Sequence, residues 1–443
     1  MIQKIDNATV REAVQQAYER CKNETGGKNA DYIPYLANVP STLFGIAACL
    51  PDGEVIAVGD TDYKFGIESV SKVPTAILTM NQYSAQEVLT KIGADATGLP
   101  FNSIMAILLE NAHPSTPLVN AGAISACSMV QPVGDSDGKW KAITGFIEGL
   151  AGSQVEVIDE LYKSETATNF NNKSIAWLLK NYNRIYDDPD MALDIYTRQC
   201  SIGVTAKQLA TMAATIANGG KNPVTKQQVF KPELSPKIAS MMATVGFYEH
   251  TGDWLFTTGL PAKTGVGGGI MGVVPGVMGV AAFAPPLDEA GNSVKAQKAL
   301  AYIAGHLNLN IFGTTRCVMA EKEAAQAETC DGNWAKGLRT SCAGLFHCGM
   351  HREAKTGRGR KKTGTAGRTI VTLFRGEEFI ARTVPGGGIR PAACEKKARA
   401  QVQTPPLVSR TVSGSCPYAQ AVPARGRDIA RVSDKFTPEE PVI

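Results

Sequence analysis

The sequence has little net charge and little histidine. Its 443 residues include 45 Lys and Arg against 41 Asp and Glu, which leaves a formal charge of +4. A charge this close to balance argues against a protein that binds nucleic acid through a strongly basic surface. At 44% apolar residues, the chain has enough hydrophobic sequence for a sizeable core, so disorder of the whole chain is excluded.

The scarcity of histidine disfavours two kinds of hydrolase site. Only five histidines are present, none of them in an HExxH motif or beside an arrangement of acid and serine. We therefore expect no Ser-His-Asp triad, no catalytic metal and no cofactor. A small zinc site could be considered in the C-terminal region, at Cys342, His347, Cys348 and His351. Their spacing matches no common zinc finger, so we interpret the four residues as unrelated.

The sequence also lacks a recognisable export signal and a cysteine pairing pattern. The start of the chain spaces its apolar residues like one face of a helix and has no hydrophobic region of the secretory type. Four cysteines are scattered without a pattern, at Cys21, Cys49, Cys127 and Cys200, and this favours reduced thiols. We therefore expect a cytoplasmic protein.

The longest uncharged run, from Gly267 to Leu287, is long enough to cross a membrane. It contains six glycines and three prolines, however, so we predict two buried strands joined at Pro275 and Gly276. The run begins with a G-x-G-x-x-G pattern at Gly267–Gly272. Strand-like sequence follows that pattern where a dinucleotide site needs a helix, so a nucleotide site is disfavoured.

The near-zero charge is the sum of two unlike regions. Residues 1–313 contain 23 basic and 29 acidic residues (−6), whereas residues 314–443 contain 22 and 12 (+10), and the two add to +4. Apolar periodicity fades after 313. We predict a folded domain over 1–313 and a basic, mostly disordered tail over 314–443. Three interpretations of the tail compete: a basic arm that binds nucleic acid or anionic membrane, a regulatory appendage, and sequence without a selected function. The composition of the tail favours the third.

Strand-like segments lie at both ends of residues 1–313, with helical patterns between them. Phe44–Leu50 and Val55–Val58 flank a hairpin signal at Asp52-Gly53, strands are expected again over about 247–284, and Thr205–Asn218 has helical spacing. We predict an α+β fold with a mostly antiparallel sheet flanked by helices. The sheet lobe takes in about 1–75 and 245–313, and an all-helical lobe, about 76–244, is inserted.

Ser69-Val70-Ser71-Lys72 lies where a strand-like segment changes to a helical one. On a helix, residues three apart share a face, so Lys72 would lie one turn above the Ser69 hydroxyl. A serine needs a nearby base to become a nucleophile, and a desolvated lysine is such a base. The spacing alone is weak evidence, because S-x-x-K also occurs at Ser136-Asp137-Gly138-Lys139, which we interpret as a polar loop.

Lys263-Thr264-Gly265 is the second candidate motif. The same tripeptide occurs twice in the tail, at 355–357 and 362–364, but only Lys263 opens an apolar, glycine-rich strand whose bare backbone can approach a substrate. The pairing of S-x-x-K with a later K-T-G is typical of serine β-lactamases and penicillin-binding proteins. Their S-D-N motif is absent here, and so is an export signal, which disfavours a cell-wall enzyme.

Longer segments resemble the bacterial glutaminases, which have the serine β-lactamase/transpeptidase-like fold. The resemblance covers about seventy per cent of the chain and is carried, in order, by segments that include GGKNADYIPYLANVP, GDTDYKFGIESVSKV, PLVNAGAIS, SETATNFNNKSIAWLL, YTRQCSIGVTAKQLA and GLPAKTGVGGGIMG. It implies hydrolysis of L-glutamine to L-glutamate and ammonia by a homo-oligomer, a dimer or tetramer. No nucleic-acid or membrane partner is expected for 1–313.

The resemblance also implies roles for particular residues. Ser69 would be the nucleophile and Lys72 its base, with Tyr196 as a further acid or base and Lys263 in the K-T-G position. Which of Lys72 and Tyr196 is the main base stays open. The glutamine-binding set would be Ser69, Asn120, Glu165, Asn172, Tyr196, Tyr248, Val266 through its main chain, and Tyr32.

These residue types suit a free amino acid. Glu165 offers the negative charge that an ammonium group needs, while Asn120 and Asn172 can donate to a carboxylate. Without the resemblance, each has an ordinary structural explanation, such as a turn residue or a charge near a helix start. Two alternatives stay open: another Ser-Lys acyl hydrolase of this fold, such as a β-lactamase or esterase, and a protein that associates with nucleic acid or membrane through its tail.

Overall fold

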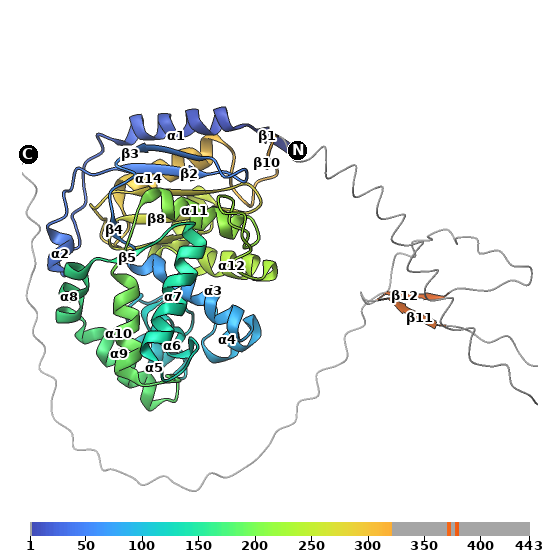
Figure 1. Ribbon diagram of the computed structural model, residues 1–443. Helices are drawn as coiled ribbons and strands as arrows, with labels where there is room; N and C mark the ends of the chain where they lie inside the picture. The colour runs from blue at the N-terminus through green and yellow to red at the C-terminus, as the bar shows by residue number, and fades with distance from the viewer. Residues whose placement is uncertain (1, 321–369, 374–376, 381–443) are drawn as a thin grey trace, which may run out of the picture. The chain divides into compact units, whose positions relative to one another are not determined.

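The computed structural model describes residues 2–320, 370–373 and 377–380. The chain divides into two units, 1–352 and 353–443. In the second unit, Ile370–Leu373 (β11) pairs with Glu377–Ile380 (β12) in antiparallel register. The features below belong to the first unit (Figure 1). Among the described residues, no helix has the length and apolar character to cross a membrane.

A five-stranded antiparallel sheet is built from both ends of the first unit. Its strand order is β3 (Val55–Gly59), β2 (Gly45–Cys49), β9 (Met278–Phe283), β8 (Gly269–Val274) and β7 (Ala262–Thr264). The central pairing joins β2 to β9, more than two hundred positions away in sequence. The predicted hairpins at Asp52-Gly53 and Pro275-Gly276 are confirmed, and Gly53 and Gly276 have positive φ there. The α+β fold with a mostly antiparallel sheet is confirmed.

Successive residues of the central strand face opposite layers of helices. Ile46 and Ala48 of β2 pack in a cluster with α1 (Asn7–Cys21) and α14 (Val294–His306). Ala47 and Cys49 pack in the other cluster, which contains α11 (Ala206–Ala217). This period of two is expected for a sheet buried on both faces. Figure 1 shows α1 along the outer face of the sheet, and α3 to α10, the helices of residues 72–200, on the side where α11 lies.

The inserted lobe is mostly helical, as predicted. It consists of the 3₁₀ turn η1 (Glu68–Ser71) and the helices α3 (Lys72–Gln82), α4 (Ala85–Lys91), α5 (Ile104–Leu109), α6 (Asn120–Met129), α7 (Ser136–Ala151), α8 (Asp159–Thr168), α9 (Phe170–Asn181) and α10 (Pro189–Cys200). A small sheet of β4 (Phe65–Gly66), β6 (Ile202–Val204) and β5 (Glu156–Val157) joins this lobe to the rest. Thr205 and Gln208 form a capping box at the start of α11.

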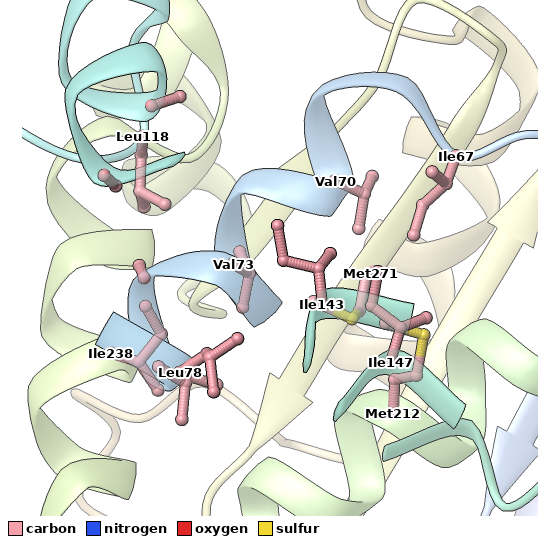
Figure 2. Close-up of a cluster of buried hydrophobic side chains, with 14 of the residues drawn as sticks. Ile67, Val70, Val73, Leu78, Leu118, Ile143, Ile147, Met212, Ile238 and Met271 are labelled. Atoms are coloured by element: carbon pink, nitrogen blue, oxygen red, sulfur yellow. The ribbon is translucent and has the colours of Figure 1, made fainter. Parts of the chain in front are cut away.

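One hydrophobic cluster connects the lobe to the sheet. Figure 2 shows Val70 and Val73, on either side of Lys72 in sequence, in a group with residues of α7, α11, α12 (Ser235–Val245) and β8. Val70 and Val73 are both fully buried. The segment that carries Ser69 and Lys72 is therefore held by the main core of the protein.

Three details differ from expectation. The region after Phe247, predicted to be strand, forms η3 (Tyr248–His250) and α13 (Thr251–Thr258). Its buried residues Thr251, Trp254 and Thr258 have helical spacing, and Trp254 stacks on Phe247 with ring centroids 4.1 Å apart.

The Ser136–Lys139 segment is the first turn of α7 rather than a polar loop, because Asp135 caps that helix by accepting a hydrogen bond from Gly138 N–H. Paired strand structure also continues past residue 313. Arg316–Met319 (β10) lies parallel to Ile2–Ile5 (β1), and Cys317 and Val318 are buried.

Lys139 is a buried lysine with a structural role. Its ammonium donates to the carbonyls of Ser128 (2.8 Å) and Val130 (2.7 Å) at the end of α6, and it pairs with Asp187 at 2.9 Å. The last carbonyls of a helix have no partner within the helix, so this ammonium supplies one. The contact joins α6, α7 and the segment before α10.

We predict that Lys139→Met lowers the free energy of unfolding by about 3–5 kcal/mol, because it leaves the Asp187 carboxylate and the α6 carbonyls buried without their cation. Lys141→Met is the matched control, since Lys141 is exposed on the same helix, and its effect should stay within about 0.5 kcal/mol. Chemical denaturation of the three proteins measures both. Equal stabilities for the two variants would contradict the role of Lys139.

Candidate active site

The junction of η1 and α3 brings the Ser69 hydroxyl and the Lys72 amine together. Lys72 Nζ lies 2.5 Å from Ser69 Oγ, and both residues are buried. Ser69 belongs to the first turn of a helical segment, where backbone N–H groups have no partner within the helix. Pro74, which follows on α3, is still in the first turn, so its missing N–H disturbs no helical hydrogen bond.

Burial controls the charge of Lys72. Desolvation lowers the pKa of this amine, although the negative charges of Glu68 and Glu165 oppose the shift. The ammonium group also lies 5.3 Å from the centre of the Tyr196 ring. A lysine with a lowered pKa is more often neutral, and a neutral amine can take a proton from the adjacent serine.

A cavity of about 140 Å³ lies over Ser69. Seven of the ten residues singled out from the sequence line it: Tyr32, Ser69, Asn120, Glu165, Asn172, Tyr196 and Val266. They come from the sheet lobe and from five separate segments of the helical lobe, so the fold brings together residues that are up to 234 positions apart, from 32 to 266. The other three, Lys72, Tyr248 and Lys263, are buried and are not among the residues that line the cavity.

One side of the cavity is strongly polar. Asn120, at the start of α6, donates a hydrogen bond of 2.8 Å to Asn172 on α9, and its own Oδ1 is buried without a partner. Glu165 on α8 also has a buried oxygen, Oε1, without a partner. Burial raises the pKa of Glu165, while its hydrogen bond with Glu68 and the charge of Lys72 act in the opposite direction. Buried polar atoms without partners at a cavity are ready to bind a polar ligand.

Tyrosine hydroxyl groups surround the dyad. Burial raises the pKa of both Tyr196 and Tyr248 well above the usual value, so both stay protonated. The Tyr248 hydroxyl is buried without a partner, and the backbone of this residue has φ 52°, a strained conformation for a residue with a side chain. Tyr32 is 58% exposed, yet its pKa is raised, first by burial around the hydroxyl and then by Glu68 and Glu165.

Lys263 supports Tyr248 rather than lining the cavity. Its amine lies 4.4 Å from the centre of the Tyr248 ring and donates to the carbonyls of Thr264 (2.7 Å) and Gly246 (3.2 Å). Burial lowers its pKa well below the usual value, and the charge of Lys72 adds to this effect. The lysine of the K-T-G motif therefore contacts Tyr248 and does not line the cavity itself.

The glycines after Lys263 serve mainly to pack against protein. A Cβ at Gly267 would lie 2.3 Å from the Gly66 carbonyl oxygen, and one at Gly265 would lie 2.8 Å from that of Ile67. The bare backbone expected here to approach a substrate thus approaches β4 and η1 as well. Turn hydrogen bonds run from Gly265 to Gly269 and from Gly268 to Gly265, which places Val266 between them at the cavity wall.

Several cavity residues were missed from the sequence. Glu68, Phe101, Asn102, Thr168, Asn169, Asn171 and Cys200 also line the cavity. Glu68 immediately precedes Ser69, the candidate nucleophile. A charged residue at an apolar junction between strand and helix could have indicated that Glu68 belongs to the site. Phe101 has no such signal, because its ring meets Tyr248, 4.2 Å away, only after folding.

The remaining candidate sites are easily placed. The G-x-G-x-x-G pattern runs from the β7–β8 loop into β8, a strand. Cys342, His347, Cys348 and His351, and the two K-T-G copies of the tail, lie outside the described residues. Within residues 2–320 and the two short tail strands, no group of three or more His, Cys, Asp or Glu side chains is arranged to hold a metal ion.

Comparison with known proteins shows the family of this chain. The glutaminase family model matches residues 27–312. A glutaminase of Bacteroides fragilis is 70% identical over 321 residues, which cover 72% of this chain and all of that protein. A glutaminase of Mycobacterium ulcerans is 51% identical over 308 residues, 70% of this chain and 96% of that protein.

Solved structures with similar folds have related descriptions. The probable glutaminase ybaS is 48% identical, with a TM-score of 0.68 over 70% of this chain and 99% of its own. A probable glutaminase from Bacillus subtilis, complexed with 6-diazo-5-oxo-L-norleucine, is 27% identical, with a TM-score of 0.61 and the same coverage. Mglu, solved in a glutamate form, is 30% identical, with a TM-score of 0.65 over 68% of this chain and 69% of its own.

Proposed function

The chain belongs to the glutaminase family and hydrolyses L-glutamine to L-glutamate and ammonia, and we propose that it does so through an acyl-enzyme on Ser69. The observation that carries this mechanism is the 2.5 Å contact between Lys72 Nζ and Ser69 Oγ beneath a cavity with a polar end. A neutral lysine takes the serine proton as the oxygen attacks the side-chain amide carbon of glutamine. The resulting oxyanion is held by the N–H groups of Ser69 and Val266, each worth roughly 3 kcal/mol.

Lys72 is the base in this proposal, and Tyr196 is an acid. The pKa of Lys72 is lowered by burial, which favours its proton-accepting form, whereas the pKa of Tyr196 is raised, which keeps its proton on the phenol. The phenol can therefore donate to the leaving nitrogen as the tetrahedral intermediate collapses and ammonia departs. Water then attacks the acyl-enzyme and gives a proton to the Tyr196 phenolate, while protonated Lys72 returns its proton to Ser69 Oγ as the ester bond breaks. L-glutamate leaves after its new carboxyl group loses a proton to solvent, with Ser69, Lys72 and Tyr196 in their starting forms.

The polar end of the cavity binds the amino-acid part of glutamine in this proposal. Glu165 accepts from the α-ammonium group and Tyr248 donates to the α-carboxylate, in agreement with the buried Glu165 Oε1 and Tyr248 hydroxyl, which have no partner. Asn120 and Asn172 donate to the same carboxylate through their amide nitrogens. Tyr32 contacts the substrate from the rim, and Lys263 supports Tyr248. A buried acid that pairs with an ammonium group favours a free amino acid over the β-lactam or ester substrates of other Ser-Lys hydrolases.

We also propose a cellular location and the limits of the catalytic domain. The five cysteines in the described part of the chain are free and buried, which supports a cytoplasmic protein. The whole Bacteroides fragilis relative aligns with 321 residues, 72% of this chain, and the last strand that the structure describes in the first unit, β10, ends at Met319. We therefore infer that residues 1–320 carry the whole activity and that the remainder, whether or not it binds nucleic acid or membrane, contributes nothing to it.

The nucleophile and the tail are tested together by measuring ammonia release from L-glutamine. We predict that Ser69→Ala loses activity by about 10⁴-fold or more while keeping its fold, and that a chain ended at Ala320 keeps the activity of the full chain. Ser136→Ala is the matched control, because it removes the serine of the other S-x-x-K motif. Substantial turnover by Ser69→Ala would refute the nucleophile, and an inactive 1–320 chain would refute the domain limits.

The ammonium site is tested by the pH dependence of KM. Because the pKa of Glu165 is raised, this group is protonated at a higher pH than an ordinary glutamate, and KM for glutamine should rise as pH falls through that range. Glu165→Gln should raise KM about 10–100-fold at neutral pH with a smaller effect on kcat, and should remove this pH dependence. Glu160→Gln, on the exposed side of the same helix, should leave both unchanged. An unaltered KM in Glu165→Gln contradicts the assignment.

We also propose a homo-oligomer, a dimer or tetramer, that buries an apolar surface of α5 and α9. Met105, Leu109, Phe170 and Trp177 are all at least 50% exposed on these two packed helices. Large apolar side chains exposed on neighbouring helices are typical of an interaction site. Sedimentation of Leu109→Ser/Phe170→Ser should show smaller species than the wild type. Phe256→Ser removes an exposed phenylalanine of α13 and should not change the assembly; a monomeric wild type would contradict the proposal.

A further inference from the structure

Glu68 is a buried carboxyl group next to the nucleophile, and no role has been given to it so far. It is only 3% exposed and lines the cavity. Its backbone has φ 50°, in the left-handed region that residues with side chains avoid. Strain of this kind, about 1–3 kcal/mol, persists where the surrounding structure holds the residue in place, often at functional sites.

Three glycines form the walls that hold this side chain. A Cβ at Gly66 would lie 3.4 Å from Glu68 Oε1, one at Gly265 would lie 3.2 Å from its Cβ, and one at Gly267 would lie 3.2 Å from its Cγ. The side chain is therefore closely packed from β4 on one side and from the β7–β8 loop on the other. The carboxyl group has little freedom to leave the cavity wall.

The Glu68 and Glu165 side chains line the same cavity, although they lie on different elements 97 positions apart, from 68 to 165. A hydrogen bond between the two carboxyl groups contributes to both pKa values, raising that of Glu68 and lowering that of Glu165. Two ionised carboxylates have no proton to share, so a hydrogen bond between them requires that one carries a proton. Each group also has a buried oxygen, Oε1, without any partner.

The groups that face this pair favour a single negative charge. They are Lys72 on α3, Tyr196 and Cys200 on α10, Tyr248 on η3, and Tyr32 just before α2 (Pro34–Ala37). Burial lowers the pKa of the lysine and raises those of the tyrosines and the thiol, so these groups are held toward their neutral forms. The pKa of Glu68 is raised well above the usual value by burial and then by Glu165.

We propose that Glu68 is a positioning residue: as a neutral carboxylic acid it donates a hydrogen bond to the Glu165 carboxylate, so that the cavity presents one oriented negative charge to the α-ammonium of the substrate. This inference rests on the proposed function, because it takes Glu165 as the ammonium-binding group. A second charge on Glu68 would repel the substrate carboxylate and the oxyanion. It would also favour protonated Lys72 and thereby weaken the base.

Kinetics of two variants test the donor role. Glu68→Gln keeps a donor of the same length and cannot ionise, so kcat and KM for L-glutamine should stay within about threefold of the wild type at neutral pH. Glu68→Met is of similar length and cannot donate, so KM should rise about tenfold or more, because a hydrogen bond to a charged group is lost. A loss of about a hundredfold or more in Glu68→Gln would show that an ionised Glu68 is needed, and would overturn the proposal.

The infrared spectrum tests the protonation state without substrate. The carbonyl stretch of a protonated carboxyl group should be present in the wild type at neutral pH, absent from Glu68→Gln and retained in Glu160→Gln, whose carboxyl group is exposed on α8. A wild type without this band at neutral pH overturns the proposal, and this measurement stands even if Glu68→Gln does not fold. An unchanged KM in Glu165→Gln would instead refute the ammonium site while leaving the infrared result intact, so the two failures are distinguishable.

Discussion

The desolvation of Lys72 is the constraint on which the rest of the site depends. An ammonium group cannot accept a proton from Ser69, and burial of Lys72 lowers its pKa and so shifts it toward the neutral amine that the proposed base requires. That environment is provided by the hydrophobic core itself, since Val70 and Val73 on either side of Lys72 pack against α7, α11 and β8. Ser69 and Lys72 are thus held by the main hydrophobic core, and the cavity lies over Ser69.

The same burial acts in opposite directions on bases and acids, and this organises the charges of the cavity. It lowers the pKa values of Lys72 and Lys263, and it raises those of Glu68, Tyr196, Tyr248 and Cys200. Burial therefore shifts most of these groups toward their neutral forms. Burial also raises the pKa of Glu165, but the charge of Lys72 and the interaction with Glu68 oppose that shift, which is why we propose Glu165 as the group that binds the ammonium. Close packing by glycines fixes the geometry, since Gly265 and Gly267 admit the β4–η1 backbone at distances that no side chain would allow.

Local sequence patterns predicted the sheet well and the surroundings of the site less well. The hairpins at Asp52-Gly53 and Pro275-Gly276 were predictable because turn chemistry is local. The segment after Phe247 was wrongly predicted as strand, because aromatic residues suit both a strand and a buried helix, and only the stacking of Trp254 on Phe247 distinguishes them. Lys72 and Lys139 share the S-x-x-K spacing, yet one touches a serine and the other caps α6, so the motif does not define the role.

The sequence by itself determined the family, the reaction and the short-range pairing of Ser69 with Lys72, because those depend on ordered motifs and on the three-residue spacing of a helix. Tertiary structure alone decided which groups surround that pair. Glu68 and Glu165 line one cavity, and Phe101 meets Tyr248, only because segments far apart in the sequence pack together in the fold. Contacts of this kind arise from the packing of whole elements, and so do the depth of burial and the resulting pKa shifts. For that reason the charge state of the cavity becomes visible only in the folded molecule.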